Sequence, residues 1–359
     1  MKKVIISGGG TGGHIFPALS IANALKRLDR DVEILFVGAE GKMEMEKVPE
    51  AGYPIVGLPV RGFRRELTLE NVKVLWNLWK SLRKAKKVIR DFRPDVVVGV
   101  GGYASGPVGR VAVKAGIPLV LQEQNSYAGV TNKLLASKAR KICVAYEGME
   151  RFFPAEKIIF TGNPVRKTLL QAQAARKEGI VLYGLDEKKK TVLVTGGSLG
   201  AGSINKAMTR VLDEAAHWDD AQILWQCGNY YYKDLAEQLK GKLPDNVKLM
   251  PFLKQMDLAY ACADLVVARA GAGTISELCL LGKAVILVPS PNVAEDHQTK
   301  NAMALVNKGA AVMIPDREVA ERLGGEMNEL LRQDGRRRLL SANILKLAMK
   351  DADEVIAKE

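Results

Sequence analysis

The feature that most constrains this chain is a pattern that occurs twice, an apolar run that leads directly into a glycine turn. Val4–Ser7 precedes Gly8–Gly13, and Val192–Thr195 precedes Gly196–Gly200. Uninterrupted runs of β-branched residues are typical of strands buried on both faces, as in a parallel sheet. A glycine turn between such a strand and a helix lets the backbone approach a phosphate group. The pattern therefore predicts two α/β halves of similar construction.

Apolar runs and amphipathic segments alternate along the rest of the chain, and 359 residues suit about two domains. The predicted fold class is α/β, with two doubly wound Rossmann-like parallel-sheet domains that face a cleft. Helices are expected at Pro17–Leu28 and Val72–Phe92. The expected strands are Val4–Ser7, Glu33–Val37, Val96–Val100, Pro118–Leu121 and Lys141–Ala145 in the first half, and Thr191–Thr195, Gln222–Gln226, Lys248–Met250, Leu265–Ala268 and Ala284–Val288 in the second.

The first glycine turn leaves two interpretations open. Gly8, Gly10 and Gly13 match the GxGxxG pattern of dinucleotide-binding proteins, although one such match is a weak signal. His14 follows, at the point where the turn becomes a helix. It is either an exposed turn residue or phosphate contact, or a general base that faces the cleft, because a neutral imidazole accepts protons near pH 7.

Two further clusters follow strands of the first half. The glycine loop Gly99–Gly106 either packs closely on a helix or joins the first turn in cradling a diphosphate. The candidates for that role are Gly10, Gly102, Tyr103 and Ser105. The polar run Gln122–Asn125 is either a solvated loop or a set of partners for sugar hydroxyls, which need both donors and acceptors.

The second half repeats the arrangement. Gly196–Gly200 suits an anion, and Arg166, near the predicted domain boundary, is placed to reach a diphosphate. Glu277 either completes an S/T-x-x-E capping box with Thr274 or accepts both hydroxyls of a ribose. Gln298 is a candidate partner for sugar hydroxyls.

In this order the motifs resemble those of the bacterial undecaprenyl-diphospho-muramoylpentapeptide β-N-acetylglucosaminyltransferases, the MurG family. The resemblance extends over nearly the whole chain. It rests on Gly8–Leu19, Gly101–Pro107, Glu123–Asn125, Ala128–Lys133, Gly162–Arg166, Gly196–Asn205, Arg269–Glu277 and His297–Ala302. It departs from the family at Gln122, where histidine is common, and at Lys254 and Gln255, where acidic residues are common.

The resemblance implies a GT-B fold and the role of each motif. Residues 1–163 would form the acceptor and membrane-associating domain, residues 164–340 the UDP-GlcNAc domain, and 341–359 a C-terminal helix that packs back on the first domain. His14 would be the catalytic base, with Glu123 as its rival. The donor-binding residues would be Thr11, Gly12, Gly13 and Asn125 near the sugar, Arg166 and Ser198 at the diphosphate, Phe252 and Leu253 at uracil, Ala272, Gly273, Thr274 and Glu277 at phosphate and ribose, and Gln298 at GlcNAc.

The implied reaction is inverting transfer of GlcNAc from UDP-GlcNAc to the muramoyl 4-hydroxyl of undecaprenyl-linked muramoyl-pentapeptide. Helix N-termini and Arg166 would stabilise the leaving diphosphate. We expect no cofactor and no metal site. Two Asp-x-Asp pairs have the spacing of a metal-binding motif. Asp29 and Asp31 precede a predicted strand, at the end opposite to the expected site, and Asp351 and Asp353 lie in the C-terminal helix.

The positive charge is concentrated in one segment. Residues 1–163 hold 26 Lys and Arg against 15 Asp and Glu, and residues 61–93 alone hold 11 against 3. Leu75, Trp79, Leu82 and Ile89 recur at helical spacing and predict one apolar face, more typical of core than of membrane contact. Trp76 projects instead towards three basic residues, Lys80, Arg83 and Lys87.

A tryptophan among basic residues suits the interface of an anionic membrane, although it is also compatible with a half-buried ring beside solvated lysines. We expect the chain on the cytoplasmic face of the plasma membrane, with no nucleic-acid partner and with a cell-wall synthesis complex as a further candidate partner. The competing interpretations are a diacylglycerol glycosyltransferase, an NAD-dependent oxidoreductase and a nucleic-acid-binding module.

Overall fold

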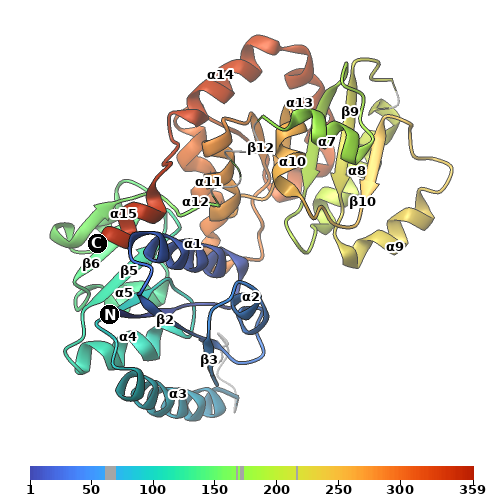
Figure 1. The fold of residues 1–359 in the computed structure, drawn as a ribbon. Helices are drawn as coiled ribbons and strands as arrows, with labels where there is room; N and C mark the ends of the chain where they lie inside the picture. Colours follow the sequence, from blue (N-terminus) through green and yellow to red (C-terminus); the bar gives the residue numbers. More distant parts are fainter. Residues whose placement is uncertain (61–69, 167–168, 170–173, 216) are drawn as a thin grey trace. The chain divides into compact units, whose positions relative to one another are not determined.

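The computed structural model describes residues 1–60, 70–166, 169, 174–215 and 217–359. They form two compact units, which we describe separately (Figure 1). Unit 1 comprises Met1–Val165 and Met349–Glu359, and unit 2 comprises Arg166–Ala348. The chain therefore leaves unit 1, builds unit 2 and returns to unit 1 for its last segment.

Unit 1 is built on a seven-stranded parallel sheet in the order β3-β2-β1-β4-β5-β6-β7. The two central strands, β1 and β4, are neighbours on either side of the point where the strand order reverses. Loops that leave their carboxyl ends are placed where open α/β sheets bind ligands. The strands are β1 (Lys3–Ser7), β2 (Glu33–Ala39), β3 (Ile55–Leu58), β4 (Val96–Gly99), β5 (Leu119–Glu123), β6 (Lys141–Val144) and β7 (Ile158–Phe160).

The helices of unit 1 cover both faces of this sheet. They are α1 (Gly12–Leu28), α2 (Glu44–Glu50), α3 (Glu70–Phe92), α4 (Ser105–Lys114), α5 (Val130–Ala136) and α15 (Ala352–Lys358). The last of them, α15, packs on α1, the helix that begins beside His14 (Figure 1). An ion pair of 2.5 Å between Arg27 and the buried Asp353 joins the two.

Unit 2 repeats the plan with six parallel strands in the order β10-β9-β8-β11-β12-β13. Its strands are β8 (Lys190–Thr195), β9 (Ala221–Gln226), β10 (Val247–Met250), β11 (Leu265–Ala268), β12 (Val285–Leu287) and β13 (Val312–Met313). Its helices are α7 (Arg176–Tyr183), α8 (Gly202–Ala215), α9 (Asn229–Gln238), α10 (Met256–Cys262), α11 (Ala272–Leu281), α12 (His297–Val306), α13 (Val319–Arg332) and α14 (Asp334–Leu345).

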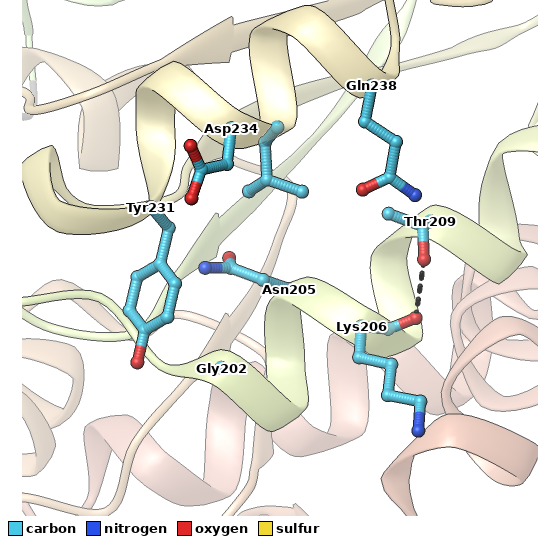
Figure 2. A pocket seen from close by; sticks show the side chains of 8 residues that line it. Gly202, Asn205, Lys206, Thr209, Tyr231, Asp234 and Gln238 are labelled. Carbon is cyan, nitrogen blue, oxygen red and sulfur yellow. Dashed lines mark hydrogen bonds between the residues drawn. The ribbon is translucent and has the colours of Figure 1, made fainter.

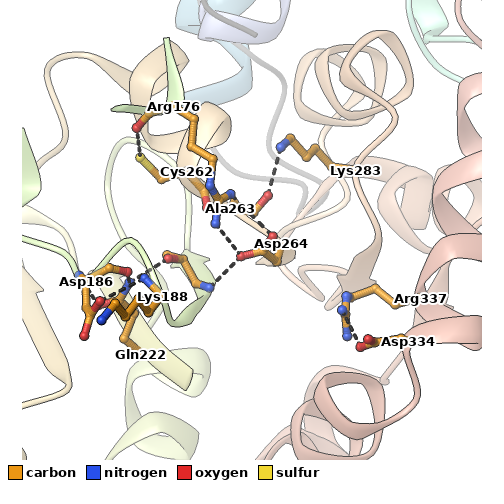
Figure 3. Close-up of polar contacts among 11 residues, drawn as sticks. Arg176, Asp186, Lys188, Gln222, Cys262, Ala263, Asp264, Lys283, Asp334 and Arg337 are labelled. Carbon is orange, nitrogen blue, oxygen red and sulfur yellow. Dashed lines mark hydrogen bonds and ion pairs between the residues drawn. The ribbon is translucent and has the colours of Figure 1, made fainter. Parts of the chain in front are cut away.

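A polar network fastens the amino ends of the central strands of unit 2 (Figure 3). Asp264, just before β11, accepts hydrogen bonds from the Thr191 backbone N–H at 2.8 Å and from the Arg176 guanidinium at 3.0 Å. Arg176 also donates to the Cys262 carbonyl oxygen at 2.7 Å. This network lies at the opposite edge of the sheet from the glycine turns, so its role is to join β8, β11 and α7.

The structure confirms the predicted fold class of two doubly wound parallel-sheet domains, including every strand expected at the two sheet centres. It adds three edge strands that the sequence analysis missed, β3, β7 and β13. α1 begins at Gly12 rather than at Pro17, which places His14 in its first turn. Within the segment 341–359, α14 ends at Leu345 and a separate helix, α15, begins at Ala352.

Candidate functional site

Two glycine loops of unit 1 meet at the carboxyl ends of β1 and β4. A Cβ on Gly102 would lie 2.3 Å from the Gly9 carbonyl oxygen, and Gly102 has a φ of +82°. A Cβ on Gly101 would lie 3.0 Å from the His14 ring. Glycine is therefore required in the second loop because it packs against the first loop and against His14, whatever the loops bind.

His14 is oriented by the turn that precedes it. Its Nδ1 atom lies 3.1 Å from the Gly9 carbonyl oxygen and 3.2 Å from the Thr11 hydroxyl. A carbonyl oxygen only accepts hydrogen bonds, so the contact with Gly9 requires the proton on Nδ1. In the neutral ring Nε2 is then the nitrogen with the lone pair, which is the nitrogen that accepts a proton in general base catalysis.

Glu44 is a buried residue of this region that the sequence did not indicate. It begins α2, is 1% exposed, and its carboxylate oxygens lie 3.1 and 3.0 Å from the Gly10 backbone nitrogen. One of them also accepts a hydrogen bond of 2.9 Å from the Ala39 N–H. The predicted diphosphate ligand Gly10 therefore donates its N–H to a carboxylate of the protein.

Glu123, the second candidate base, holds the loop that follows β5. One of its oxygens accepts from the Asn125 N–H and Nδ2 at 3.1 and 3.4 Å. The other accepts from the Gly129 N–H at 3.0 Å and from Asn132 Nδ2 at 2.9 Å. Burial raises the pKa of Glu123, and these hydrogen bonds offset part of the increase. The side chain is 2% exposed, so its geometry suits the positioning of Asn125 better than proton transfer.

The remaining acceptor-site candidates divide by exposure. Ser105 is 1% exposed and donates its hydroxyl to the Gly102 carbonyl oxygen at 3.0 Å, whereas Tyr103 is 58% exposed. Gln122 and Gln124 are buried and hydrogen-bond each other. Gln122 also donates to Asn163 at 3.0 Å, which donates in turn to the Gln124 carbonyl oxygen at 2.9 Å. Both glutamines therefore brace the loop, and Tyr103 is the exposed side chain of the predicted set.

In unit 2, Gln226 at the end of β9 holds the first glycine turn by a hydrogen bond. Its Nε2 donates to the Gly197 carbonyl oxygen at 2.8 Å, and its Oε1 accepts from the Leu253 N–H at 3.3 Å. This one side chain joins the turn after β8 to the loop after β10. Ser198 in the turn is exposed, and Phe252 is 41% exposed beside the buried Leu253.

The second turn of unit 2 leads into α11. The helix begins at Ala272 after the N-cap Gly271, so Thr274 is not an N-cap and the capping box does not form. Glu277 instead forms a 3.0 Å ion pair with Arg166. Burial raises the pKa of Glu277, and Arg166 and the hydroxyl of the buried Tyr260 offset part of the increase. Two predicted donor-binding residues are thus adjacent.

Arg269 and Gln298 brace the same edge. The Arg269 guanidinium pairs with Asp316 at 2.5 Å and donates to the Ser203 hydroxyl at 2.9 Å. Gln298 accepts a hydrogen bond of 2.9 Å from the Ser290 N–H. Hydrogen bonds and an ion pair from Arg269 and Gln298, which belong to the predicted motifs, therefore connect the loops at the carboxyl edge of the sheet in unit 2.

Comparison with known proteins gives the family. The model of the glycosyltransferase family 28 N-terminal domain matches residues 4–144, and that of its C-terminal domain matches residues 191–356. The chain belongs to glycosyltransferase family 28. His14, Glu44 and Glu123 lie in the N-terminal match, Glu277 and Gln298 in the C-terminal match, and Arg166 between them.

The relatives of this family 28 chain confirm the resemblance that the motifs indicated. It is 58% identical to the UDP-N-acetylglucosamine–N-acetylmuramyl-(pentapeptide) pyrophosphoryl-undecaprenol N-acetylglucosamine transferase of Parabacteroides distasonis, over 99% of this chain and 97% of the relative. The enzyme of the same name from Bacteroides fragilis is 57% identical, over 99% and 94%. The crystal structure of Acinetobacter baumannii MurG superposes with a TM-score of 0.80 at 27% identity, over 100% and 99%.

The basic helix of this family 28 chain, α3, differs from its predicted arrangement. Val74, Ser81, Ala85 and Ile89 form its buried face, whereas Trp79, expected with the core, is 43% exposed. Trp79 stacks on Trp76, which is 55% exposed, with ring centroids 5.0 Å apart. Lys80 and Arg83 lie over the two rings. The two tryptophans and their basic neighbours form one exposed surface, while the side chain of Leu75 lies outside the described residues.

A hollow of about 260 Å³ lies between α8 and α9 of this family 28 chain (Figure 2). Asn205, Lys206, Tyr231 and Asp234 are among its lining residues, and none of the predicted donor-binding residues belongs to it. Asn205 is engaged elsewhere, since it donates to the Cys227 carbonyl oxygen at 2.9 Å and accepts from the Trp225 indole at 3.1 Å. The hollow follows from helix packing and carries no part of the predicted site.

The two Asp-x-Asp pairs have structural partners. Asp29 accepts a hydrogen bond of 3.0 Å from the Asp31 N–H at the end of α1, and Asp353 pairs with Arg27. Within the described ranges, no group of three or more His, Cys, Asp and Glu side chains is arranged to hold a metal ion. In the same ranges, no helix is long and apolar enough to cross a membrane.

Proposed function

We propose that this chain transfers N-acetylglucosamine from UDP-N-acetylglucosamine to the muramoyl 4-hydroxyl of undecaprenyl-diphospho-muramoyl-pentapeptide in peptidoglycan synthesis, with His14 as the general base. The full-length identity to the Parabacteroides and Bacteroides enzymes supports the substrates. The observation that carries the catalytic role is the contact between His14 Nδ1 and the Gly9 carbonyl oxygen, which leaves Nε2 as the basic nitrogen.

On the acceptor side, Nε2 of His14 takes the proton of the attacking hydroxyl as the oxygen bonds to the anomeric carbon. Attack from the face opposite UDP inverts that carbon. A positioned base of this kind contributes about 10²- to 10⁴-fold to the rate. Glu123 takes no part in proton transfer. It positions Asn125, because its two oxygens hold the backbone of the loop that carries this residue.

On the donor side, the charge that grows on the leaving diphosphate is met by Arg166, by Ser198 and by the N–H groups at the start of α8 and α11. Glu277 accepts hydrogen bonds from the ribose hydroxyls, Phe252 packs on uracil, and Gln298 forms hydrogen bonds with GlcNAc. The support for this assignment is the 3.0 Å contact of Arg166 with Glu277, which brings a phosphate-binding cation next to a ribose-binding carboxylate.

The chain acts at the cytoplasmic face of the plasma membrane as a peripheral protein. The surface of α3 supports this, because two stacked and exposed tryptophans lie beside Lys80 and Arg83. Each basic side chain near an anionic membrane contributes about 1 kcal/mol. Arg83→Glu combined with Lys87→Glu is therefore expected to weaken sedimentation with anionic vesicles at least about 10-fold. Unchanged sedimentation would contradict this placement, and UDP affinity serves as the control.

The reaction is tested by transfer of labelled GlcNAc from UDP-GlcNAc to a lipid-linked muramoyl-pentapeptide. Product with the wild-type chain and its loss in His14→Gln are expected. Transfer to diacylglycerol instead would overturn the acceptor assignment. Thermal stabilisation by UDP and UDP-GlcNAc but not by NAD separates a glycosyltransferase from an oxidoreductase.

A further inference from the structure

Glu44 is a buried carboxylate that the proposed mechanism leaves without a role. It lies 34 residues beyond Gly10 in the chain, yet both of its oxygens approach the Gly10 N–H, at 3.1 and 3.0 Å. Its side chain fills the space in which a Cβ of Gly9 would lie, 2.0 Å from Oε1, and in which a Cβ of Gly38 would lie, 2.5 Å from Cγ. The glycines at these two positions are therefore explained by Glu44.

Glu44 and His14 form hydrogen bonds with the same peptide group, the one between Gly9 and Gly10. The N–H of Gly10 and the C=O of Gly9 belong to the same planar unit, because a peptide bond joins these residues. Glu44 holds the N–H end, and His14 Nδ1 lies 3.1 Å from the C=O end. We propose that Glu44 positions and polarises the His14 imidazole through the Gly9–Gly10 peptide, which makes it a positioning residue of the catalytic base.

The physical effect has two parts. A carboxylate that accepts from the N–H moves electron density towards the carbonyl oxygen, and chains of hydrogen bonds strengthen one another in this way, by roughly 10–30% per bond. The carbonyl oxygen then holds the Nδ1–H tautomer more firmly and stabilises the imidazolium formed when Nε2 takes a proton. A carboxylate that bonds His directly does the same in the serine hydrolase triad; in this chain a peptide group lies between the two.

The charge of Glu44 is what distinguishes this arrangement from simple packing. Burying a carboxylate costs more than burying a neutral amide of the same shape. Within the described ranges, no Lys, Arg or His forms an ion pair with Glu44, whose partners there are the Gly10 and Ala39 N–H groups. The groups around His14 include the Thr11 hydroxyl, the Gly9 carbonyl oxygen and Gly101. Hydrogen bonds through the Gly9–Gly10 peptide thus join the Glu44 carboxylate to the ring.

The inference rests on the proposed role of His14, but its test does not depend on activity. The chain has 3 histidines, so the ring signals of each can be followed by nitrogen-detected NMR and assigned with a His14→Gln variant. In the wild-type chain we expect neutral His14 as the Nδ1–H tautomer. In Glu44→Gln we expect its pKa to fall by about one unit and the Nδ1–H fraction to fall, because the negative charge is lost.

The matched control is Glu46→Gln, which changes an exposed glutamate on the same helix and should leave His14 unaltered. Glu44→Asp keeps the charge, so the pKa of His14 should return towards the wild-type value. In transfer assays Glu44→Gln should lower kcat about 10-fold and shift the acid limb of its pH profile to lower pH, with the KM for UDP-GlcNAc unchanged.

Two results would overturn the inference. One is an Nε2–H tautomer of His14 in the wild-type chain, which needs no variant and decides the question even if Glu44→Gln does not fold. The other is a folded Glu44→Gln variant with the wild-type pKa and tautomer of His14. Failure of the proposed function has a different signature, since His14→Gln would then retain transfer activity whatever Glu44 does to the ring.

Discussion

Both units place glycine turns after two neighbouring central strands, yet the backbone groups of these turns are engaged differently. In unit 1 the Gly10 N–H binds Glu44, and the Gly9 carbonyl oxygen lies against His14 and Gly102. In unit 2 the Gly197 N–H donates to the Thr195 hydroxyl, the Gly197 carbonyl oxygen accepts from Gln226, and Arg166 pairs with Glu277 of α11. A carboxylate behind a turn opposes an anion, whereas a guanidinium attracts one. On the proposed assignment, the same strand–turn–helix unit therefore positions a base in unit 1 and binds an anion in unit 2.

The largest expected effect separates the two halves directly. His14→Ala should lower kcat by about 10²- to 10⁴-fold, because the base is lost. UDP affinity, which depends on unit 2, should stay within about twofold of wild type in calorimetric titration. His217→Ala, at an exposed position of unit 2, is the control. A kcat within about threefold of wild type would remove His14 from the mechanism.

The reciprocal change is Glu277→Gln. Hydrogen bonds to charged groups contribute about 1.5–3 kcal/mol, so UDP-GlcNAc should bind about 10- to 100-fold more weakly. The pKa and tautomer of His14 should not change. Glu237→Gln, on the exposed side of α9, provides the control. Full affinity in Glu277→Gln would mean that the carboxylate does not contact ribose.

The pH dependence of donor binding sharpens the role of Glu277. In the proposed complex the ribose hydroxyls donate hydrogen bonds to the ionised carboxylate, and burial raises the pKa of Glu277 above the usual value of 4.5. Binding of UDP-GlcNAc should therefore weaken as the pH falls through this raised pKa, at a higher pH than an exposed glutamate would give. Titrations over a pH series should show this acid limb, and Glu277→Gln should abolish it.

The smallest expected effect is on stability, and it is tested by alanine substitutions at the adjacent glycines of the first turn. Gly9→Ala should cost about 3 kcal/mol of unfolding free energy, because its Cβ would meet the Glu44 carboxylate. Gly10→Ala and Gly197→Ala should each cost about 1 kcal/mol, from positive φ alone. Urea denaturation measures all three. Equal losses would show that Glu44 does not confine the turn.

The sequence was sufficient to predict the central strands of both sheets, because long β-branched runs that alternate with helices are typical of a parallel sheet covered on both faces. It missed β3, β7 and β13, which are short edge strands of two to four residues. Such strands gain their stability from a neighbour in the sheet. Trp79 was misplaced for a related reason, since helical spacing identifies a face but not its limits, and the buried face runs through Ser81 and Ala85.

The elements that carry the candidate site could be predicted from the sequence, but the hydrogen bonds within it could not. Motif order placed all three candidates after central strands: Glu123 ends β5, whereas His14 and Glu277 lie in the helices that follow β1 and β11. Nothing local marks Glu44, because its partner Gly10 is 34 residues away and the segment around it is an ordinary mixture of methionines and charged residues. The capping box failed because α11 begins at Ala272, two residues before Thr274. Tertiary contacts, not local pattern, decide these points.

The return of the chain to unit 1 determines the order in which the protein can be completed. Unit 1 includes Met349–Glu359, a segment that is synthesised after the whole of unit 2, whereas unit 2 ends at Ala348. The helix that begins beside His14 gains its partner α15 only then. All of unit 2 is therefore synthesised before the last segment of unit 1, and removal of α15 should destabilise unit 1 while leaving unit 2 intact.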